Sequence, residues 1–274
     1  MKNVFFLTLL TILTCRTVFG QETFQINSKY LAKKTPFIIQ KPDNYQSSKK
    51  YPLVFMLHGY SQNYEQWSKT TDLKKLANNY QMILACPEGF VSFYINSPNL
   101  KNSQYEDFFF QELMPEIKKN FSIDSNNIFI TGLSMGGYGA LHLFVKNSDF
   151  FNTAASTSGG LEFDYENLKK NSLIFFGNER LTNDLNEILG DHNQNDWNQC
   201  NISTLLEQHT DFNKGFLLDC GLQDPLLVNT LKVKELALAK KLPITFITQP
   251  GEHNKEYWRK SIEYHFIYFK QHLK

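Results

Sequence analysis

The segment Ile128–Ala140, with the sequence IFITGLSMGGYGA, decides how this chain is interpreted. It begins as a short apolar strand, passes through the pattern G-x-S-x-G and continues into a predicted helix. A serine hydroxyl on such a sharp strand-to-helix turn is exposed, and a nearby base can take its proton as it attacks. Gly132 and Gly136 stand where a side chain would collide across the turn. The segment therefore predicts Ser134 as a nucleophile. The alternative is a glycine-rich turn with a capping serine.

A serine nucleophile of this type works in a catalytic triad with a histidine base and an acid. The three residues follow one another along the chain in the order serine, acid, histidine. His253 lies on a loop directly after the apolar segment Ile244–Ile247, which is predicted to be a strand. His192 and His209 fall in a polar stretch, and His265 lies within the last predicted helix. We therefore predict His253 as the general base.

The acid of the triad has two candidates near the end of another predicted strand, Phe216–Leu218. Asp219 directly follows the strand, and Asp224 lies on the next loop, before Pro225 at a predicted helix start. A loop carboxylate can turn toward His253, whereas Asp219 would orient the loop. We predict Asp224 as the acid, with Asp219 as the alternative. A helix N-cap is the other role open to Asp224.

A tetrahedral intermediate of acyl transfer needs two hydrogen-bond donors for its oxyanion. In this type of site the residue after the nucleophile, here Met135, supplies one backbone N–H, and a loop after an earlier strand supplies the other. Leu53–Leu57 is predicted to be that strand and is followed by His58-Gly59-Tyr60. We predict that the backbone N–H groups of Met135 and Tyr60 form the oxyanion hole, and that the His58 ring shapes the loop.

Length and composition limit the function classes. The chain has 274 residues, a net charge of +1 and 42% hydrophobic residues, which is enough for one sizeable core. A charge this near zero gives no electrostatic reason to bind nucleic acid, and no apolar run is long enough to span a bilayer. We expect no cofactor and no metal site, because His192, Asp191 and Asp196 follow no known ligand spacing.

The N-terminus has the layout of a secretory signal peptide. Lys2 precedes the apolar run Val4–Leu13, and cleavage is expected after Gly20. We therefore predict a signal peptide over residues 1–20, a single domain over residues 21–274, and export to the periplasm or the medium. The alternative is a buried N-terminal strand or helix.

Export would place the cysteines of the mature chain in an oxidising compartment. Cys86, Cys200 and Cys220 are an odd set, so at most one disulfide could form among them. Cys86 ends an apolar strand pattern and is expected to be a buried thiol. Whether Cys200 pairs with Cys220 stays open.

Apolar segments of strand length alternate with amphipathic stretches of helix length. The segments predicted as strands are 35–40, 53–57, 82–86, 128–130, 216–218 and 244–247. The segments predicted as helices are 107–120 with a kink at Pro115, a helix face at 141–145, then 226–241 and 254–273. This alternation predicts an α/β fold with a mostly parallel central sheet and helices on both faces.

Residues 163–213 interrupt the alternation, and their middle, residues 178–201, is dense in Asn, Asp and Gln. Sites in sheets of this kind lie beyond the carboxyl ends of the strands. We predict a polar insertion over the C-terminal edge of the sheet, forming a lid or a pocket wall. The role of residues 178–211 within it stays open.

Together these pieces resemble the α/β-hydrolase fold and, more narrowly, the Putative esterase family, which includes esterase D (S-formylglutathione hydrolase), tributyrin esterases and feruloyl esterases. The motifs that carry the resemblance are 57–59 (LHG), 94–98 (YINSP), 105–107 (YED), 112–115 (ELMP), 132–140 (GLSMGGYGA), 220–224 (CGLQD), 251–253 (GEH) and 257–258 (YW). They cover most of the chain after residue 20. The family implies a serine esterase with Ser134, Asp224 and His253 as its triad, and Tyr60 and Met135 as oxyanion donors.

The leading hypothesis is therefore a serine esterase that hydrolyses short acyl, acetyl or feruloyl groups on carbohydrate through an acyl-enzyme. Its partner would be a small-molecule or oligosaccharide ester. Tyr94 and Trp258 stand in motif segments and are predicted to line the substrate pocket, because aromatic rings stack on sugars and phenolic acids. Packing in the core is the alternative role for both rings.

Other functions use the same residues. An acyltransferase of the mycolyltransferase kind shares the first half-reaction and passes the acyl group to an alcohol in place of water. Siderophore esters are another substrate class, suggested by the enterochelin esterases of the same broad family. A non-catalytic binding protein on a hydrolase scaffold is a third alternative, and an intact Ser134, Asp224 and His253 argue against it.

Overall fold

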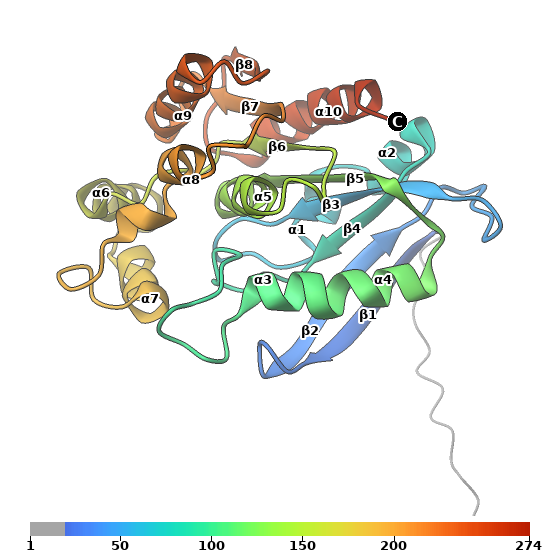
Figure 1. Cartoon of the computed structure of the whole chain (residues 1–274), viewed down its shortest axis with the longest axis horizontal. Helices are drawn as coiled ribbons and strands as arrows, with labels where there is room; N and C mark the ends of the chain where they lie inside the picture. Colours follow the sequence, from blue (N-terminus) through green and yellow to red (C-terminus); the bar gives the residue numbers. More distant parts are fainter. Residues whose placement is uncertain (1–19) are drawn as a thin grey trace, which may run out of the picture.

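The computed structural model describes residues 20–274, so most of the predicted signal peptide lies outside the described residues. The described chain forms an eight-stranded sheet in the order β1-β2-β4-β3-β5-β6-β7-β8 (Figure 1). The strands are β1 (Gln21–Ser28), β2 (Lys33–Gln40), β3 (Tyr51–Leu57), β4 (Ile83–Pro87), β5 (Ile123–Leu133), β6 (Thr153–Thr157), β7 (Phe216–Gly221) and β8 (Thr245–Gln249). β1 and β2 pair antiparallel at one edge, and every pair from β4 to β8 is parallel.

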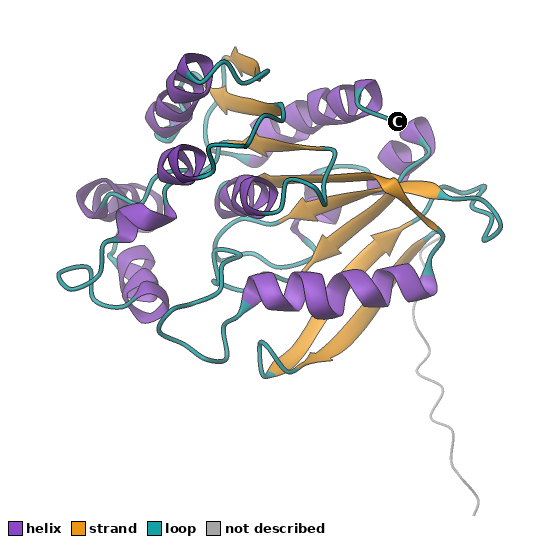
Figure 2. Ribbon diagram, viewed as in Figure 1, coloured by secondary structure: helices purple, strands orange, loops and turns teal. Residues whose placement is uncertain are grey.

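Helices cover both faces of the sheet (Figure 2). On one face, apolar side chains of β3 and β5 pack against α1 (Gln66–Thr70), α2 (Leu73–Tyr80) and α10 (Lys255–Gln271). On the other face, alternate residues of the same strands pack against α5 (Met135–Lys146), α9 (Leu227–Ala239) and the helical segment 105–120. Parallel strands buried on both faces need near-continuous apolar runs, which β3 supplies. The predicted α/β-hydrolase fold is confirmed.

The segment predicted as one helix kinked at Pro115 is continuous but has three parts. These are α3 (Tyr105–Phe108), the π-helix η1 (Phe109–Leu113) and α4 (Met114–Asn120). Proline has no N–H to donate to the preceding turn, and its ring crowds that turn. The wider π-turn directly before Pro115 accommodates the ring, so the helix continues.

The insertion over residues 163–213 is more ordered than its polar composition suggests. It holds α6 (Tyr165–Phe176), α7 (Arg180–Leu189), the 3-10 turn η2 (Trp197–Cys200) and α8 (Ile202–Gln208). α7 buries Leu185 and Ile188 on its inner face. Figure 1 shows α6 and α7 beyond the carboxyl ends of β3 and β5, as predicted for a lid or pocket wall.

The described residues also bear on membrane spans and on the cysteines. None of their helices is long and apolar enough to cross a membrane. Cys86, Cys200 and Cys220 are all free thiols, so the structure contains no bond between Cys200 and Cys220. Burial raises the pKa of the Cys200 thiol to about 11, which leaves it protonated near neutral pH.

Candidate active site

Ser134 stands on the turn between β5 and α5 with φ 54° and ψ −120°, a backbone conformation that is strained for a residue with a side chain. Neighbouring atoms require glycine on both sides. A Cβ on Gly132 would lie 2.1 Å from the carbonyl oxygen of Gly136, and a Cβ on Gly136 would lie 2.3 Å from that of Leu57. The Ser134 N–H donates to the Thr157 carbonyl of β6 at 3.1 Å, which fixes the turn against the sheet.

Ser134, His253 and Asp224 converge as predicted from the sequence. The Ser134 hydroxyl lies 3.0 Å from His253 Nε2, and His253 Nδ1 lies 2.9 Å from Asp224 Oδ2. The Asp224 side chain is completely buried, whereas 12% of the His253 side chain is exposed. Asp224 Oδ1 also accepts the Leu226 N–H at 2.9 Å, at the start of the α9 segment. The carboxylate is thus held in place and can in turn orient the imidazole.

The loops after β7 and β8 are joined by hydrogen bonds that bring Asp224 and His253 together. The Gln223 N–H donates to the Gly251 carbonyl at 2.9 Å, and the Gly251 N–H donates to Gln223 Oε1 at 2.8 Å. The Asp224 N–H donates back to the Gly221 carbonyl at 3.1 Å. Acid and base therefore share one rigid unit at the edge of the sheet.

Asp219, the alternative acid, lies elsewhere. Its carboxylate is fully buried and accepts hydrogen bonds from Thr157 at 3.0 Å, Ser261 at 2.5 Å and His265 Nε2 at 2.8 Å. The other ring nitrogen of His265 accepts the Thr131 hydroxyl at 2.7 Å. Asp219 therefore belongs to a second carboxylate–imidazole–hydroxyl array under α10, and it makes no contact with His253.

The two predicted oxyanion donors, Met135 and Tyr60, both line the pocket that holds Ser134. Within residues 20–274, neither backbone N–H donates to a protein acceptor, so both are free to bind a substrate oxygen. The neighbouring Gly59 N–H is already used, donating to Gln66 Oε1 at 2.7 Å.

His58 shapes this loop from below. Its Nδ1 donates to the Gly59 carbonyl at 2.8 Å, and its Nε2 accepts the Gly89 N–H at 2.7 Å. Glu88 Oε1 lies 3.2 Å from the same Nε2. Because Nε2 uses its lone pair to accept the nearer Gly89 N–H, it carries no proton to donate to Glu88. The ring is 1% exposed and in contact with backbone, as expected for a structural histidine.

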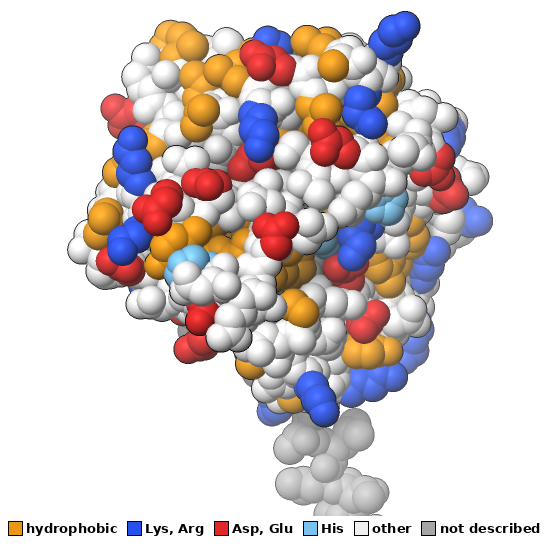
Figure 3. Space-filling view, turned by 60° about the vertical axis from the view of Figure 1, so that its left-hand side comes forward, with side chains coloured by type: hydrophobic (Ala, Val, Ile, Leu, Met, Phe, Trp, Pro, Cys, Tyr) orange, Lys and Arg blue, Asp and Glu red, His pale blue; other side chains and the backbone are white. Residues whose placement is uncertain are grey.

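The pocket beside Ser134 has a volume of about 270 Å³. One apolar side of it comes from the insertion, through Leu168, Phe175 and Phe176 of α6 and Leu181 of α7. The sequence predicted a wall from this region without identifying the residues, because Phe175 and Phe176 lie in no recognisable motif. Figure 3 shows this end of the molecule, with hydrophobic side chains among polar and charged ones.

Apart from Ser134 and His253, most of the polar side chains that line the pocket are amides. Gln62, Asn171 and Asn229 face the pocket and make no side-chain hydrogen bond to any described residue. None of the described residues that line the pocket is Lys, Arg, Asp or Glu. The site therefore offers neutral hydrogen-bonding groups beside an apolar wall.

Of the two predicted substrate-binding aromatic residues, Trp258 lines the pocket and Tyr94 does not. The Trp258 ring stands edge-on to the His253 ring, with centroids 5.1 Å apart, and Phe175 packs on His253 at 4.6 Å. The prediction for Tyr94 is wrong. Its ring is fully buried beneath the loop, and its hydroxyl donates to the His58 carbonyl at 2.7 Å.

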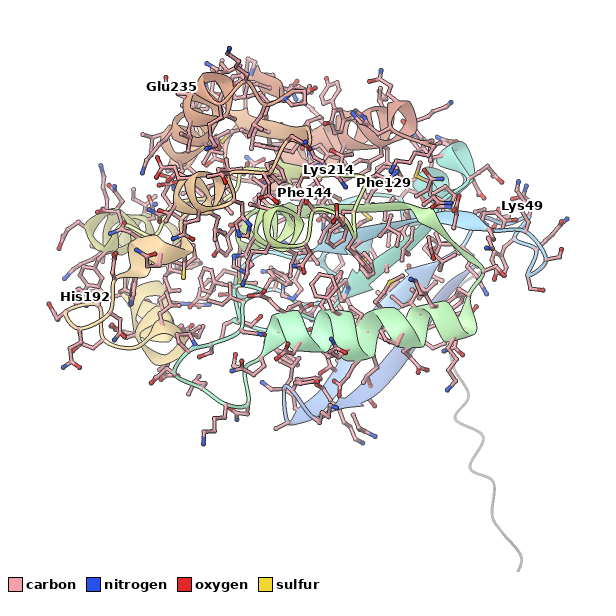
Figure 4. All side chains as sticks on the ribbon, viewed as in Figure 1. Lys49, Phe129, Phe144, His192, Lys214 and Glu235 are labelled. Atoms are coloured by element: carbon pink, nitrogen blue, oxygen red, sulfur yellow. The ribbon has the colours of Figure 1, made fainter. Side chains whose placement is uncertain are left out.

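Residues 20–274 contain no group of three or more His, Cys, Asp or Glu side chains that could hold a metal ion. His192 lies at the outer end of the insertion (Figure 4). Its ring stacks flat on Tyr165, with centroids 3.5 Å apart, and packs edge-on against Trp197. These contacts give His192 a packing role within the insertion.

Comparison with known proteins finds relatives along most of the chain. A family model, Esterase, described as Putative esterase, matches residues 28–269. An acetyl esterase of Caldicellulosiruptor saccharolyticus is 28% identical over 87% of this chain and 94% of its own length. An S-formylglutathione hydrolase of Arabidopsis thaliana is 23% identical over 90% of this chain and 91% of its own length. A solved structure of a ferulic acid esterase covers 93% of this chain and 100% of its own, with 22% identity and a TM-score of 0.75, a likeness of fold.

Proposed function

The chain belongs to the Putative esterase family, and from that premise we propose a serine esterase in which Ser134, His253 and Asp224 perform ester hydrolysis. Family membership and the acetyl esterase relative make it a carboxylic ester hydrolase. The observation that carries the finer proposal is the 3.0 Å separation of Ser134 Oγ and His253 Nε2, at the wall of a pocket open to substrate.

The mechanism has two halves. His253 Nε2 takes the Ser134 proton while Oγ forms a bond to the ester carbonyl carbon. The tetrahedral intermediate collapses, the ester C–O bond breaks, and the leaving alkoxide receives that proton from His253. Water then gives a proton to His253 and attacks the acyl-enzyme, and the proton returns to Ser134 as the acid product leaves. Asp224 stabilises the imidazolium in both halves.

The oxyanion of each intermediate is stabilised by the backbone N–H groups of Met135 and Tyr60. Met135 is the first residue of α5, where backbone amides point toward developing negative charge. Removing one such donor typically costs about 10²- to 10³-fold in rate. Because the donors belong to the backbone, they can be displaced by shifts of the loop but not removed by most substitutions.

The proposed substrates are esters of short acyl or feruloyl groups on carbohydrate. The insertion wall, with Phe175 and Phe176, suits an apolar or aromatic acyl group. The free amides of Gln62, Asn171 and Asn229 suit hydroxyl groups of a sugar. A lining without Lys, Arg, Asp or Glu favours a neutral ester over the glutathione moiety, which carries two carboxylates and an ammonium group. The names of the acetyl esterase relative and the ferulic acid esterase neighbour agree with this class.

We also propose that residues 1–20 are a signal peptide and that residues 21–274 work as one exported domain. Support comes from the fold, because β1 begins at Gln21, the residue that cleavage would make the N-terminus. Mass spectrometry of the protein recovered from the periplasm or the medium tests this. A chain that starts at Met1 and stays in the cytoplasm would contradict it.

The test of function is a hydrolysis panel on purified residues 21–274. It includes aryl esters from acetyl to lauroyl, methyl ferulate and acetylated xylan oligomers. We expect turnover of short and feruloyl esters, covalent labelling of Ser134 by a fluorophosphonate, and loss of both in Ser134→Ala. The matched control is Ser48→Ala, an exposed serine near the opposite end of β3. Wild-type rates in Ser134→Ala would refute the assignment.

A further inference from the structure

Tyr60 has two roles that the proposed mechanism does not connect. Tyr60 lines the substrate pocket and its backbone N–H has no acceptor within residues 20–274, while its side chain reaches into the insertion. The Tyr60 hydroxyl donates a hydrogen bond to Asp184 of α7. Arg180, one turn earlier on α7, donates from Nε to the same hydroxyl oxygen at 3.4 Å. Its guanidinium also lies 5.0 Å from the centroid of the Tyr60 ring and 4.7 Å from that of Phe176.

α7 is itself fixed to the body of the molecule. The Ser97 hydroxyl donates to the Ile188 carbonyl at 2.5 Å, and Asn99 Nδ2 donates to the Glu187 carbonyl at 2.7 Å. Leu185, on the inner face of the same helix, is fully buried. Asp184 therefore has a fixed position on α7, and its hydrogen bond fixes the hydroxyl end of the Tyr60 side chain.

We propose that Asp184 and Arg180 are positioning residues, which set the placement of the Tyr60 backbone N–H in the oxyanion hole. The inference rests on the proposed serine esterase function and deepens it. The insertion then contributes to the chemical step as well as to the pocket wall. A tyrosine side chain has only two rotatable bonds before its rigid ring, so a hydroxyl fixed at one end restrains the backbone at the other.

The Tyr60 hydroxyl keeps the proton that it donates to Asp184 at neutral pH and well above it. Burial, reinforced by the Asp184 carboxylate, raises the pKa of Tyr60 to about 12. The hydroxyl therefore remains a donor well above neutral pH. An effect that acts through this hydrogen bond should be the same between about pH 6 and pH 9, about three or more units below that pKa.

The experiment compares Tyr60→Phe, Asp184→Leu, Asp184→Asn and the double variant Tyr60→Phe/Asp184→Leu on an aryl acetate. The small acyl group makes little use of the insertion wall, which isolates the effect on the oxyanion hole. Asn keeps an acceptor oxygen for the Tyr60 hydroxyl, whereas Leu keeps only the bulk. The matched control is Glu179→Gln, which breaks the Lys169–Glu179 ion pair on the same insertion without touching Tyr60.

We expect Tyr60→Phe and Asp184→Leu each to lower kcat about 10- to 100-fold with KM within about 2-fold, because a donor displaced by a fraction of an ångström loses part of its 10²- to 10³-fold effect. Asp184→Asn should recover most of the rate, and the double variant should be no slower than the worse single variant. Affinity for a boronate that mimics the tetrahedral intermediate should fall with kcat, while affinity for the product acid should not.

Three results would overturn the proposal. These are an unchanged kcat in Asp184→Leu, a change in KM alone, and independent losses that multiply in the double variant. Thermal unfolding of each variant separates loss of rate from loss of fold. If hydrolysis by the wild-type chain does not depend on Ser134, the proposed function itself fails. If it does depend on Ser134 and Asp184→Leu behaves like Glu179→Gln, only the positioning role fails.

Discussion

Two arrays of a hydroxyl, an imidazole and a carboxylate lie close together in this molecule. The pocket array is Ser134, His253 and Asp224, and the buried array is Thr131, His265 and Asp219. In both, the hydroxyl comes from β5 or its end, the carboxylate from β7 or its loop, and the histidine from the last part of the chain. Hydroxyl-to-nitrogen distances are 3.0 Å in the pocket array and 2.7 Å in the buried array.

The arrays differ in access, backbone conformation and ring orientation. Thr131 lies within the strand and is fully buried, as are His265 and Asp219. Ser134 stands on a strained turn beside a pocket and free backbone donors. In the pocket array Nδ1 faces the carboxylate and Nε2 the hydroxyl, whereas the buried array has the reverse orientation. The same three chemical groups are therefore proposed to serve catalysis in the pocket array and stabilise the sheet in the buried array, and their surroundings account for the difference.

The largest effect is expected from Ser134→Ala in the pocket array. Removal of the proposed nucleophile should lower kcat/KM by about 10⁵-fold or more, about 7 kcal/mol of barrier. The melting temperature should stay the same or rise, because alanine makes no buried contact worse. The measurement is hydrolysis of an aryl acetate with unfolding followed by circular dichroism. A retained rate would mean that the two arrays do not differ in the proposed way.

Asp224→Asn should have the next largest effect on rate. The amide can still accept from Leu226 but no longer stabilises an imidazolium, and it favours the wrong tautomer of His253. We expect a loss of about 10⁴-fold in kcat, about 5.5 kcal/mol, with a much smaller change in the free energy of unfolding. Steady-state kinetics together with urea unfolding check this. A variant that unfolds easily but keeps its turnover would make Asp224 structural.

Asp219→Ala should give the opposite pattern in the buried array. It leaves His265, Ser261 and Thr157 without their buried acceptor, which should lower the free energy of unfolding by about 3 to 5 kcal/mol. Turnover per folded molecule should change by less than about 10-fold, because Asp219 touches no proposed reacting group. Urea unfolding and active-site titration with a fluorophosphonate measure the two quantities. If Asp219→Ala were fully folded but inactive, the buried array would be needed for the activity of the pocket array.

The smallest effect is expected from Thr131→Val. Valine has nearly the same shape, and it leaves His265 Nδ1 without its hydrogen-bond partner. Such an unpaired buried group should cost about 1 to 3 kcal/mol in unfolding free energy and leave kcat unchanged. Ser134→Val, by contrast, should abolish turnover. If Thr131→Val and Ser134→Val changed kcat equally, the proposed functional difference between the two arrays would be wrong.

The strand-to-helix turn at Ser134 could be predicted from the sequence, because the backbone geometry requires its glycines. Strand β6 could not be predicted. Its sequence, Thr153–Thr157, is made of small residues whose burial comes from neighbours on both faces. The choice of Asp224 over Asp219 rested on loop position and agreed with the structure. A linear pattern gave no sign that Asp219 serves a second array, since its partner His265 is 46 residues away.

The pocket was less predictable than the triad. Tyr94 and Trp258 are both aromatic residues in motif segments, and only their packing shows that one is under the loop and the other at the pocket. Asp184 and Arg180 were missed because charged residues on an amphipathic helix normally face solvent. Their contact with Tyr60 spans more than 100 residues of chain, and no local spacing records it.

The hydrogen bonds between Gln223 and Gly251 have a consequence for inactivation by heat. They make Asp224 and His253 move together with β7 and β8, whereas Ser134 follows β5, on the far side of β6. If the hydrogen bonds between β6 and β7 break, Asp224 and His253 would move away from the Ser134 hydroxyl while they stay hydrogen-bonded to each other. Thermal loss of turnover in this protein should then track the opening of that single strand boundary and can precede global melting.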